Sequence, residues 1–309
     1  MEITKQRNSL TIIIPVFNEQ DNIQLSSETL ITILNRQSLV FKILYIDDGS
    51  QDKTWEQIQF VIKQHPTLIQ GLKFTKNFGK ESAIAAGLDH CKTDAALIID
   101  GDLQHPPTLI PSMIKHWRNY EADVVEGIKS PKTSSQSLFH KMYFSLFKKM
   151  IGFDMSISSD FKLLDRSAIE DWKKLPERGL FFRGMSHWIG RKRIQLEFDV
   201  QPRLQGQTKW SFWGLLQLAI HSLLAYSSAP IRIIGLVGIF FVILSFIFGS
   251  IALYQKFMGI AVSGFTTVIL LLLFLGGCIL FSLCLIGYFI GNIYNEVKFR
   301  PRYLIEYEI

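Results

Sequence analysis

Short apolar runs alternate with amphipathic segments over the first 130 residues of the chain. Five of these runs have the length and the β-branched content of buried strands: residues 10–17, 41–46, 68–75, 95–99 and 122–127. The segments between them are predicted helices: residues 22–35, 54–64, 80–91 and 109–120. Strands that alternate with helices in this way predict an α/β fold with a mostly parallel sheet and right-handed crossovers.

Acidic residues follow three of the predicted strands. Glu19 comes after the first strand, Asp48 after the second, and Asp100 and Asp102 after the fourth. Because right-handed crossovers place the carboxyl ends of parallel strands at one edge of the sheet, these side chains are expected to converge there, where open α/β sheets bind ligands. Gly101, between the two aspartates, allows a ligand to approach the backbone closely.

The pair formed by Asp100 and Asp102 is a candidate metal site. With the carboxamide oxygen of Gln104, it forms a set of hard oxygen ligands that suits Mg²⁺ or Mn²⁺ and leaves positions open for phosphates. A solvated turn rich in Asp and Gly would have the same composition. The expected convergence with the other acidic loops favours the metal site.

After residue 230 the chain becomes almost wholly apolar. No charged residue occurs from 233 to 254 or from 257 to 295, and each run exceeds the roughly 20 residues that span ~30 Å of hydrocarbon. We therefore predict two transmembrane helices, at about residues 231–254 and 265–290. Two buried core helices are the alternative. Glycines in the second run, Gly276 and Gly277 among them, are compatible with a homo-oligomer packed through these helices.

Two aromatic-rich segments precede the apolar runs. Residues 137–151 place Lys141 and Lys148 opposite an apolar face, which predicts an amphipathic helix in the lipid interface; docking on the domain's own core is the alternative. Residues 212–229 are a predicted juxtamembrane helix in which His221 has a structural role. The predicted organisation has four parts: a catalytic domain over 1–211, the juxtamembrane helix over 212–229, the spans over 230–295 and a tail over 296–309.

Charge and cysteine content indicate the compartment. Lys and Arg number 33 against 27 Asp and Glu, for a net charge of +6, and the bases lie before the spans and in the tail at 298–302. The positive-inside rule then predicts a multi-pass protein of a plasma membrane with both termini and the catalytic domain in the cytoplasm. No signal peptide is visible, and three cysteines do not indicate a disulfide framework. The basic balance fits a membrane surface or phosphates, and not nucleic acid, because no basic platform interleaved with aromatic residues occurs.

Further polar candidates lie between residue 158 and the first span. Asp160 is an acid between apolar neighbours. Arg178, Arg183, Arg203 and Lys209 are predicted phosphate ligands, because Arg forks match phosphate oxygens and Lys adds a point charge. Ordinary surface charge is the alternative for each of them.

Six motifs occur in the order found in one known family: IPVFNE at 14–19, DDGS at 47–50, NFGKE at 77–81, DGDLQHPP at 100–107, SDFKL at 159–163 and GQTKW at 206–210. Together they resemble a family 2 glycosyltransferase of GT-A fold. More narrowly, the chain resembles polyisoprenyl-phosphate glycosyltransferases, the relatives of dolichol-phosphate mannose synthase and of bacterial undecaprenyl-phosphate glucosyltransferases. The likeness covers almost the whole chain, including the paired spans and NEVKFRP at 295–301.

The resemblance implies a Rossmann-like GT-A domain followed by interface helices and two transmembrane helices, and it assigns roles to residues. The implied nucleotide-sugar site consists of Pro15, Asn18, Glu19, Asp48, Lys80, Asp100, Gly101, Asp102 and Gln104. Asp100, Asp102 and Gln104 would hold Mg²⁺ or Mn²⁺. The implied acceptor-phosphate site consists of Arg178, Arg183, Arg203 and Lys209, and the implied catalytic residues are Asp102, Asp160, Arg203 and Lys209. Two departures, Gly101 where Ala is commoner and Ser159 where many relatives carry Gly, leave the donor sugar open.

The implied reaction is inverting transfer of a sugar, from UDP-glucose or UDP-N-acetylglucosamine, to a polyprenyl phosphate such as undecaprenyl phosphate. Because the acceptor phosphate is mostly ionised near neutrality, we expect Asp160 to orient substrate and not to be an obligatory proton acceptor. The alternatives are a GDP-mannose-dependent synthase, a processive polysaccharide synthase, a nucleotide-sugar-binding protein without activity, and a transporter or scaffold. A processive synthase would need a many-helix channel, which two spans cannot form alone.

Overall fold

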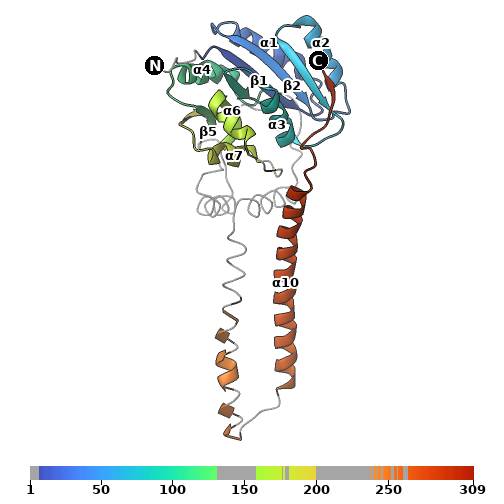
Figure 1. Cartoon of the computed structure of the whole chain (residues 1–309), viewed down its shortest axis with the longest axis vertical. Coiled ribbons are helices and arrows are strands. Elements are labelled where there is room, and N and C mark those ends of the chain that lie inside the picture. The colour runs from blue at the N-terminus through green and yellow to red at the C-terminus, as the bar shows by residue number, and fades with distance from the viewer. Residues whose placement is uncertain are drawn as a thin grey trace. The chain divides into compact units, whose positions relative to one another are not determined.

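The computed structural model divides the chain into two compact units (Figure 1). The first comprises Met1–Lys209 and Pro301–Ile309, and the second comprises Trp210–Arg300. The structure describes residues 7–130, 158–175, 177, 181–199 and 264–309, with scattered positions between 238 and 259.

The first unit is built from one sheet and the helices that cover it. Its strands are β1 (Ser9–Val16), β2 (Val40–Asp47), β3 (Ile69–Phe74), β4 (Ala95–Ile98), β5 (Val124–Lys129), β6 (Ser158–Asp165), β7 (Arg193–Phe198) and β8 (Ile305–Glu308). Its helices are α1 (Ile23–Leu34), α2 (Thr54–Gln64), α3 (Lys80–His90), the short 3₁₀ helix η1 (Pro107–Leu109), α4 (Ile110–Arg118), α6 (Arg166–Lys173) and α7 (Phe182–Trp188). All five predicted strands and all four predicted helices occur within a few residues of their expected positions.

The sheet has eight strands in the order β7-β5-β6-β4-β1-β2-β3-β8. The pairs β1–β2, β2–β3, β1–β4 and β5–β7 are parallel, which confirms the mostly parallel sheet. Strand β6 runs antiparallel to both β4 and β5, and β8 runs antiparallel to β3. Strands β2 and β3 lie in order on one side of β1, and the next strand along the chain, β4, lies on the other side of β1. The switch point of the sheet therefore lies between β1 and β4.

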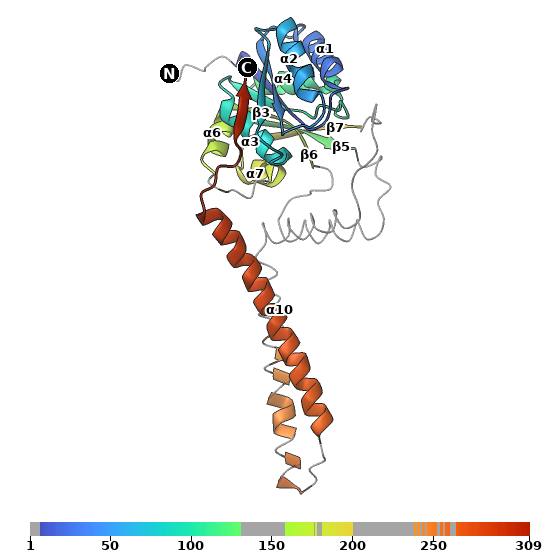
Figure 2. The same cartoon turned by 90° about the vertical axis from the view of Figure 1, so that its right-hand side faces the viewer.

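Helices cover both faces of the sheet (Figure 2). One core packs α1, α2 and α4 against side chains such as Ile12 and Ile14, and the other packs α3, α6 and α7 against Ile13 and its neighbours. Strand β1 is buried on both faces, as its continuous apolar run requires. Helix α3 approaches it closely at Gly87, where an added Cβ would lie 2.3 Å from Ile13 Cγ2. The small residues of α3, among them Gly87, thus let the helix pack directly on the central strand.

The end of the chain returns to the first unit as strand β8, which the sequence did not predict. Tyr307 stacks on Trp55 with ring centroids 6.2 Å apart, and Tyr303 stacks on Phe74 at 5.1 Å. Arg302 donates hydrogen bonds to two backbone carbonyl oxygens near the end of α6, both at 2.7 Å. Residues after 301, expected to form a tail, therefore cover the β3 edge of the sheet.

The second unit contains α10 (Phe265–Val297), a helix of 33 residues. Its segment Phe274–Val297, with mean hydropathy 2.1, is long and apolar enough to cross a membrane. This helix contains the second predicted span and continues beyond it. Half of the predicted first span at 231–254 lies outside the described residues, and the predicted helices at 137–151 and 212–229 lie wholly outside them.

Candidate active site

A hollow of about 290 Å³ opens beside the carboxyl ends of β1 and β4, at the switch point of the sheet. Seven of the residues predicted to bind the nucleotide sugar line it: Pro15, Glu19, Asp48, Lys80, Asp100, Gly101 and Asp102. Four lining residues were missed: Val16, Phe17, Asn77 and Gly79. The predicted residues Asn18 and Gln104 do not line it. The acidic loops converge, as the shared edge of the parallel strands required.

Asn18 joins two of the loops beside the hollow instead of lining it. Its backbone N–H donates to Ser50 Oγ, and its side-chain oxygen accepts from the backbone N–H of Gln51, both at 2.9 Å. Asn18 has φ of 54°, a left-handed conformation that Asn tolerates better than most residues. The loop after β1 is therefore fixed to the loop after β2.

Asp48 organises the loop that precedes α3. Its carboxylate accepts hydrogen bonds from the backbone N–H groups of Phe78, at 2.7 Å, and Gly79, at 2.9 Å. Burial raises the pKa of Asp48, and the two hydrogen bonds oppose that shift. Gly49 follows with φ of 71°, and a Cβ there would lie 2.4 Å from the carbonyl carbon of Lys76. The DDGS motif thus fixes this loop against β2 while it presents Asp48 to the hollow.

Asp100 and Asp102 lie in a tight turn against the end of β1. Asp102 Oδ1 accepts from the backbone N–H of Gln104 at 3.1 Å, and Leu103 between them has φ of 55°. An added Cβ on Gly101 would lie 2.9 Å from Val16 Cγ1, so this turn needs glycine for its close approach to the strand. A non-glycine residue in the left-handed region stores strain, as is common where a turn presents ligands.

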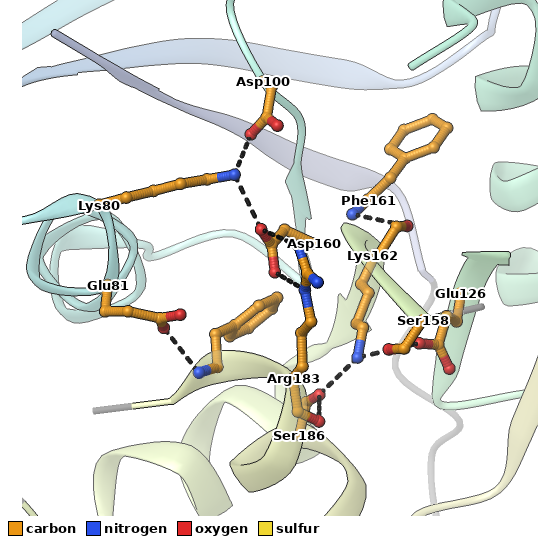
Figure 3. A network of polar contacts seen from close by, with 12 residues as sticks. Lys80, Glu81, Asp100, Glu126, Ser158, Asp160, Phe161, Lys162, Arg183 and Ser186 are labelled. Carbon is orange, nitrogen blue, oxygen red and sulfur yellow. Dashed lines mark hydrogen bonds and ion pairs between the residues drawn. The ribbon is translucent and has the colours of Figure 1, made fainter. Parts of the chain in front are cut away.

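Lys80 and Asp160 form the centre of a charged network with Asp100 and Arg183 (Figure 3). Lys80 Nζ lies 2.6 Å from Asp100 Oδ1 and 2.8 Å from Asp160 Oδ2. Arg183 donates to Asp160 twice, from Nε at 2.8 Å and from a terminal nitrogen at 3.1 Å. Burial would raise the pKa of Asp160, but Lys80 and Arg183 outweigh it and hold that pKa well below its usual range. The carboxyl of Asp160 is therefore ionised at neutral pH.

Glu81 borders this network, although no sequence pattern had assigned it a role. It accepts a hydrogen bond from the backbone N–H of Phe182 at 2.6 Å, which ties α3 to α7 (Figure 3). Burial, helped by the nearby charge of Asp160, raises the pKa of Glu81 to about 7. Its contact with α7 helps to place Arg183, the next residue, against Asp160.

A second buried network lies behind Asp160. Lys162 is fully buried, its Nζ lies 3.1 Å from Glu126 Oε1, and it donates to Ser186 Oγ at 2.7 Å. Glu126 also contacts Arg193 at 3.0 Å and accepts from Ser158 Oγ at 2.6 Å. Burial lowers the pKa of Lys162 to about 8. Burial would raise the pKa of Glu126, but its partners Lys162 and Arg193 outweigh that effect and lower it. Because Ser186 in turn donates to the carbonyl oxygen of Arg183, this network supports the residues that hold Asp160.

Glu126→Gln is expected to destabilise the protein by about 3 kcal/mol, because it leaves the Lys162 ammonium buried without its counter-charge. Lys162→Met is expected to cost less, about 1–2 kcal/mol, since Glu126 keeps Arg193 and Ser158. Thermal unfolding of both variants in the same detergent at pH 7 measures the difference.

The loss in Glu126→Gln is expected to shrink as the pH rises toward about 8 and to change little above it. The pKa of Lys162 in the folded wild type, about 8, lies below its ordinary value of 10.5, and removal of the Glu126 carboxylate, which raises this pKa, lowers it further. Between that lower pKa and about 8 the folded variant has lost the proton on Lys162 while its unfolded chain keeps it, so raising the pH stabilises the variant but not the wild type. Equal losses in the two variants, unchanged by pH, would contradict a buried ion pair.

The turn that carries Asp100 and Asp102, called the acid turn below, fits a divalent cation. Asp100 Oδ1 is buried and accepts no hydrogen bond of ordinary geometry within the described part of the chain, although the Lys80 ammonium lies 2.6 Å away. The described residues contain no group of three or more His, Cys, Asp or Glu placed to hold a metal. A cation here would therefore have two carboxylates at most, with a carboxamide, phosphates and water as its other ligands, which is typical of Mg²⁺ and Mn²⁺.

Only one of the four predicted ligands of the acceptor phosphate lies in the described part of the chain. Arg183 lies on α7 and is bound to Asp160, so its contact with phosphate stays a prediction. Arg178, Arg203 and Lys209 lie outside the described residues.

Known proteins resemble this chain over nearly its whole length. The model of Glycosyl transferase family 2 matches residues 11–171. The chain is 34% identical over 305 residues to the bactoprenol glucosyl transferase of Shigella phage SfX, covering 96% of this chain and 98% of that protein. It is also 34% identical over 302 residues to the prophage bactoprenol glucosyl transferase homolog of Escherichia coli (strain K12), with the same coverage of 96% and 98%.

Two solved structures share the fold of the first unit. Glucosyl-3-phosphoglycerate synthase from Mycobacterium tuberculosis, in complex with Mn²⁺, UDP and phosphoglyceric acid, has a TM-score of 0.51 and 16% identity over 71% of this chain and 78% of that chain. Mannosyl-3-phosphoglycerate synthase from Rubrobacter xylanophilus has a TM-score of 0.51 and 15% identity over 70% of this chain and 71% of that chain. At these identities the likeness shows the fold alone.

Proposed function

Since the chain belongs to glycosyl transferase family 2 and has a GT-A-like fold, we propose that it transfers glucose from UDP-glucose to a polyprenyl phosphate. The observation that carries this proposal is the likeness to bactoprenol glucosyl transferases, which spans both the acid-lined hollow and the apolar helix α10. A sugar transferase with an isoprenoid acceptor needs both parts, because its donor is water-soluble and its acceptor remains in the lipid.

In the proposed reaction, an oxygen of the acceptor phosphate forms a bond to C1 of glucose. The bond from C1 to the β-phosphate oxygen of UDP breaks, and the configuration at C1 inverts. The last pKa of the acceptor phosphate, about 6 by analogy with phosphorylated side chains, leaves it ionised near neutrality. No residue must therefore take a proton from it, and a carboxyl with a pKa as low as that of Asp160 would be a weak base.

Asp160 acts in this proposal as a fixed negative charge. Held by Lys80 and Arg183, it keeps both cations beside the acid turn, where they would stabilise the negative charge that develops on the diphosphate. Mg²⁺ or Mn²⁺ held by Asp100, Asp102 and Gln104 would supply further positive charge to the leaving group when bound. Arg203 and Lys209 are proposed to bind the acceptor phosphate.

We also propose that the chain crosses a membrane twice, with both termini in the cytoplasm. The second unit is joined to the first at both of its ends, and β8, which follows α10, pairs with β3 in the catalytic sheet. If α10 spans a membrane, the chain must also cross it before α10 for both joins to lie on one side. This requirement supports the predicted span at about 231–254. A homo-oligomer packed through the spans stays a prediction.

A donor panel tests the proposed reaction. Detergent-purified full-length protein is given undecaprenyl phosphate, Mg²⁺ or Mn²⁺, and radiolabelled UDP-glucose, UDP-N-acetylglucosamine or GDP-mannose. Label from UDP-glucose should enter the lipid phase in proportion to acceptor and should fail to do so with EDTA. Label from GDP-mannose alone would support the mannose synthase instead, label in polymer would support a processive synthase, and no transfer would support a binding protein.

A further inference from the structure

Bases already lie against the carboxylates of the acid turn and of Asp160 without any bound ion. Three acids, Asp100, Asp102 and Asp160, face the bases Lys80 and Arg183. A third base, Lys129 at the end of β5, interacts electrostatically with the same groups. The Asp100 carboxylate is therefore already paired with a base before any cation binds.

Lys80 lies where it would compete with that cation. Its ammonium is 2.6 Å from Asp100 Oδ1, an oxygen that a metal at the acid turn would need (Figure 3). Like charges so close together repel strongly where solvent is partly excluded. Lys80 must therefore give up this contact when a cation binds to Asp100.

Lys80 can move without disrupting the rest of the network. Its side chain is 40% exposed and lines the hollow, and it begins α3 directly after Gly79, so it can turn toward a ligand there. Asp160 would keep the two hydrogen bonds from Arg183. What Lys80 then needs is another anion, and a diphosphate in the hollow would supply one.

From these contacts we propose that Lys80 occupies the cation's place at Asp100 until a nucleoside diphosphate binds, and so makes metal binding depend on the nucleotide. This inference rests on the proposed metal-dependent transfer. In this proposal Lys80 acts before the reaction, because it keeps a divalent cation out of the site until the nucleotide has bound.

Binding of Mn²⁺, followed by the electron paramagnetic resonance signal of the free ion, tests the proposal without any turnover. In the full-length wild-type protein, UDP should strengthen Mn²⁺ binding. Without UDP, Lys80→Met should bind Mn²⁺ roughly tenfold more tightly than the wild type, because the competing charge is gone. Lys80→Arg keeps the charge and should behave as the wild type. Lys76→Met, which removes a lysine four residues earlier, is the matched control and should change nothing.

The outcomes separate this inference from the proposed function. If Lys80→Met without UDP binds Mn²⁺ no more tightly than the wild type, the role of Lys80 is refuted while metal-dependent transfer stands. Wild-type binding that does not respond to UDP refutes it equally. If the wild type binds no Mn²⁺ even with UDP and transfers glucose in EDTA, the inference and the proposed metal site fail together.

Discussion

Asp100→Asn is expected to lower kcat/KM for glucosyl transfer about a thousandfold, because a catalytic metal contributes several kcal/mol of charge stabilisation in the transition state. The substitution keeps the size of the side chain but removes the charge that would hold the cation. It also removes one of the two carboxylates that contact Lys80. Steady-state kinetics with UDP-glucose and undecaprenyl phosphate measure the loss.

The same variant should lose UDP-dependent binding of Mn²⁺, as expected if the kinetic loss reflects a missing metal. Asp21→Asn is the matched control, since Asp21 is exposed in the loop after β1 and does not line the hollow. It should leave both the kinetics and the binding of Mn²⁺ unchanged. Near wild-type activity of Asp100→Asn would show that the acid turn does not hold a catalytic cation.

Asp160→Asn is expected to lower kcat about a hundredfold, the size of effect seen when one preorganised electrostatic group is lost. The change leaves the cations of Lys80 and Arg183 without the carboxylate that places them. KM for UDP-glucose should change little, because the residues proposed to line the nucleotide site at the end of β1 and in the loops after β1 and β2 are not touched. Turnover against pH and donor concentration measures both quantities.

The pH profile distinguishes placement of charge from proton transfer at Asp160. The pKa of this carboxyl lies well below its ordinary value, so its contribution to stability is complete above that value and is lost only as the pH falls through the lowered pKa. Wild-type kcat should therefore show no step from this group between about pH 6 and 8. Asp171→Asn, on α6, is the control and should retain full activity. Complete loss of turnover in Asp160→Asn, with UDP still bound and no recovery at high pH, would indicate a general base.

Much of the fold and part of the site could be read from the sequence because both depend on local patterns. Apolar runs such as residues 10–17 and 95–99 predict buried strands wherever they lie, and alternation with helices makes those strands parallel. Parallel strands share one carboxyl edge, so Glu19, Asp48 and Asp102 had to converge. The segments after β5 were harder, because α6, α7 and β7 are short and β6 runs antiparallel.

The partners of each charge were decided by the tertiary structure. Lys80 and Asp160 are 80 positions apart, and nothing near either residue indicates that they touch. The same holds for Glu126 with Lys162, and for β8, a short strand that forms only because the edge of β3 offers it hydrogen bonds. Hydrophobic periodicity is a property of neighbours along the chain, so it can be recognised in the sequence alone. An ion pair is a property of neighbours in space, and only the packing of the sheet with α3 and α7 brings these charges together.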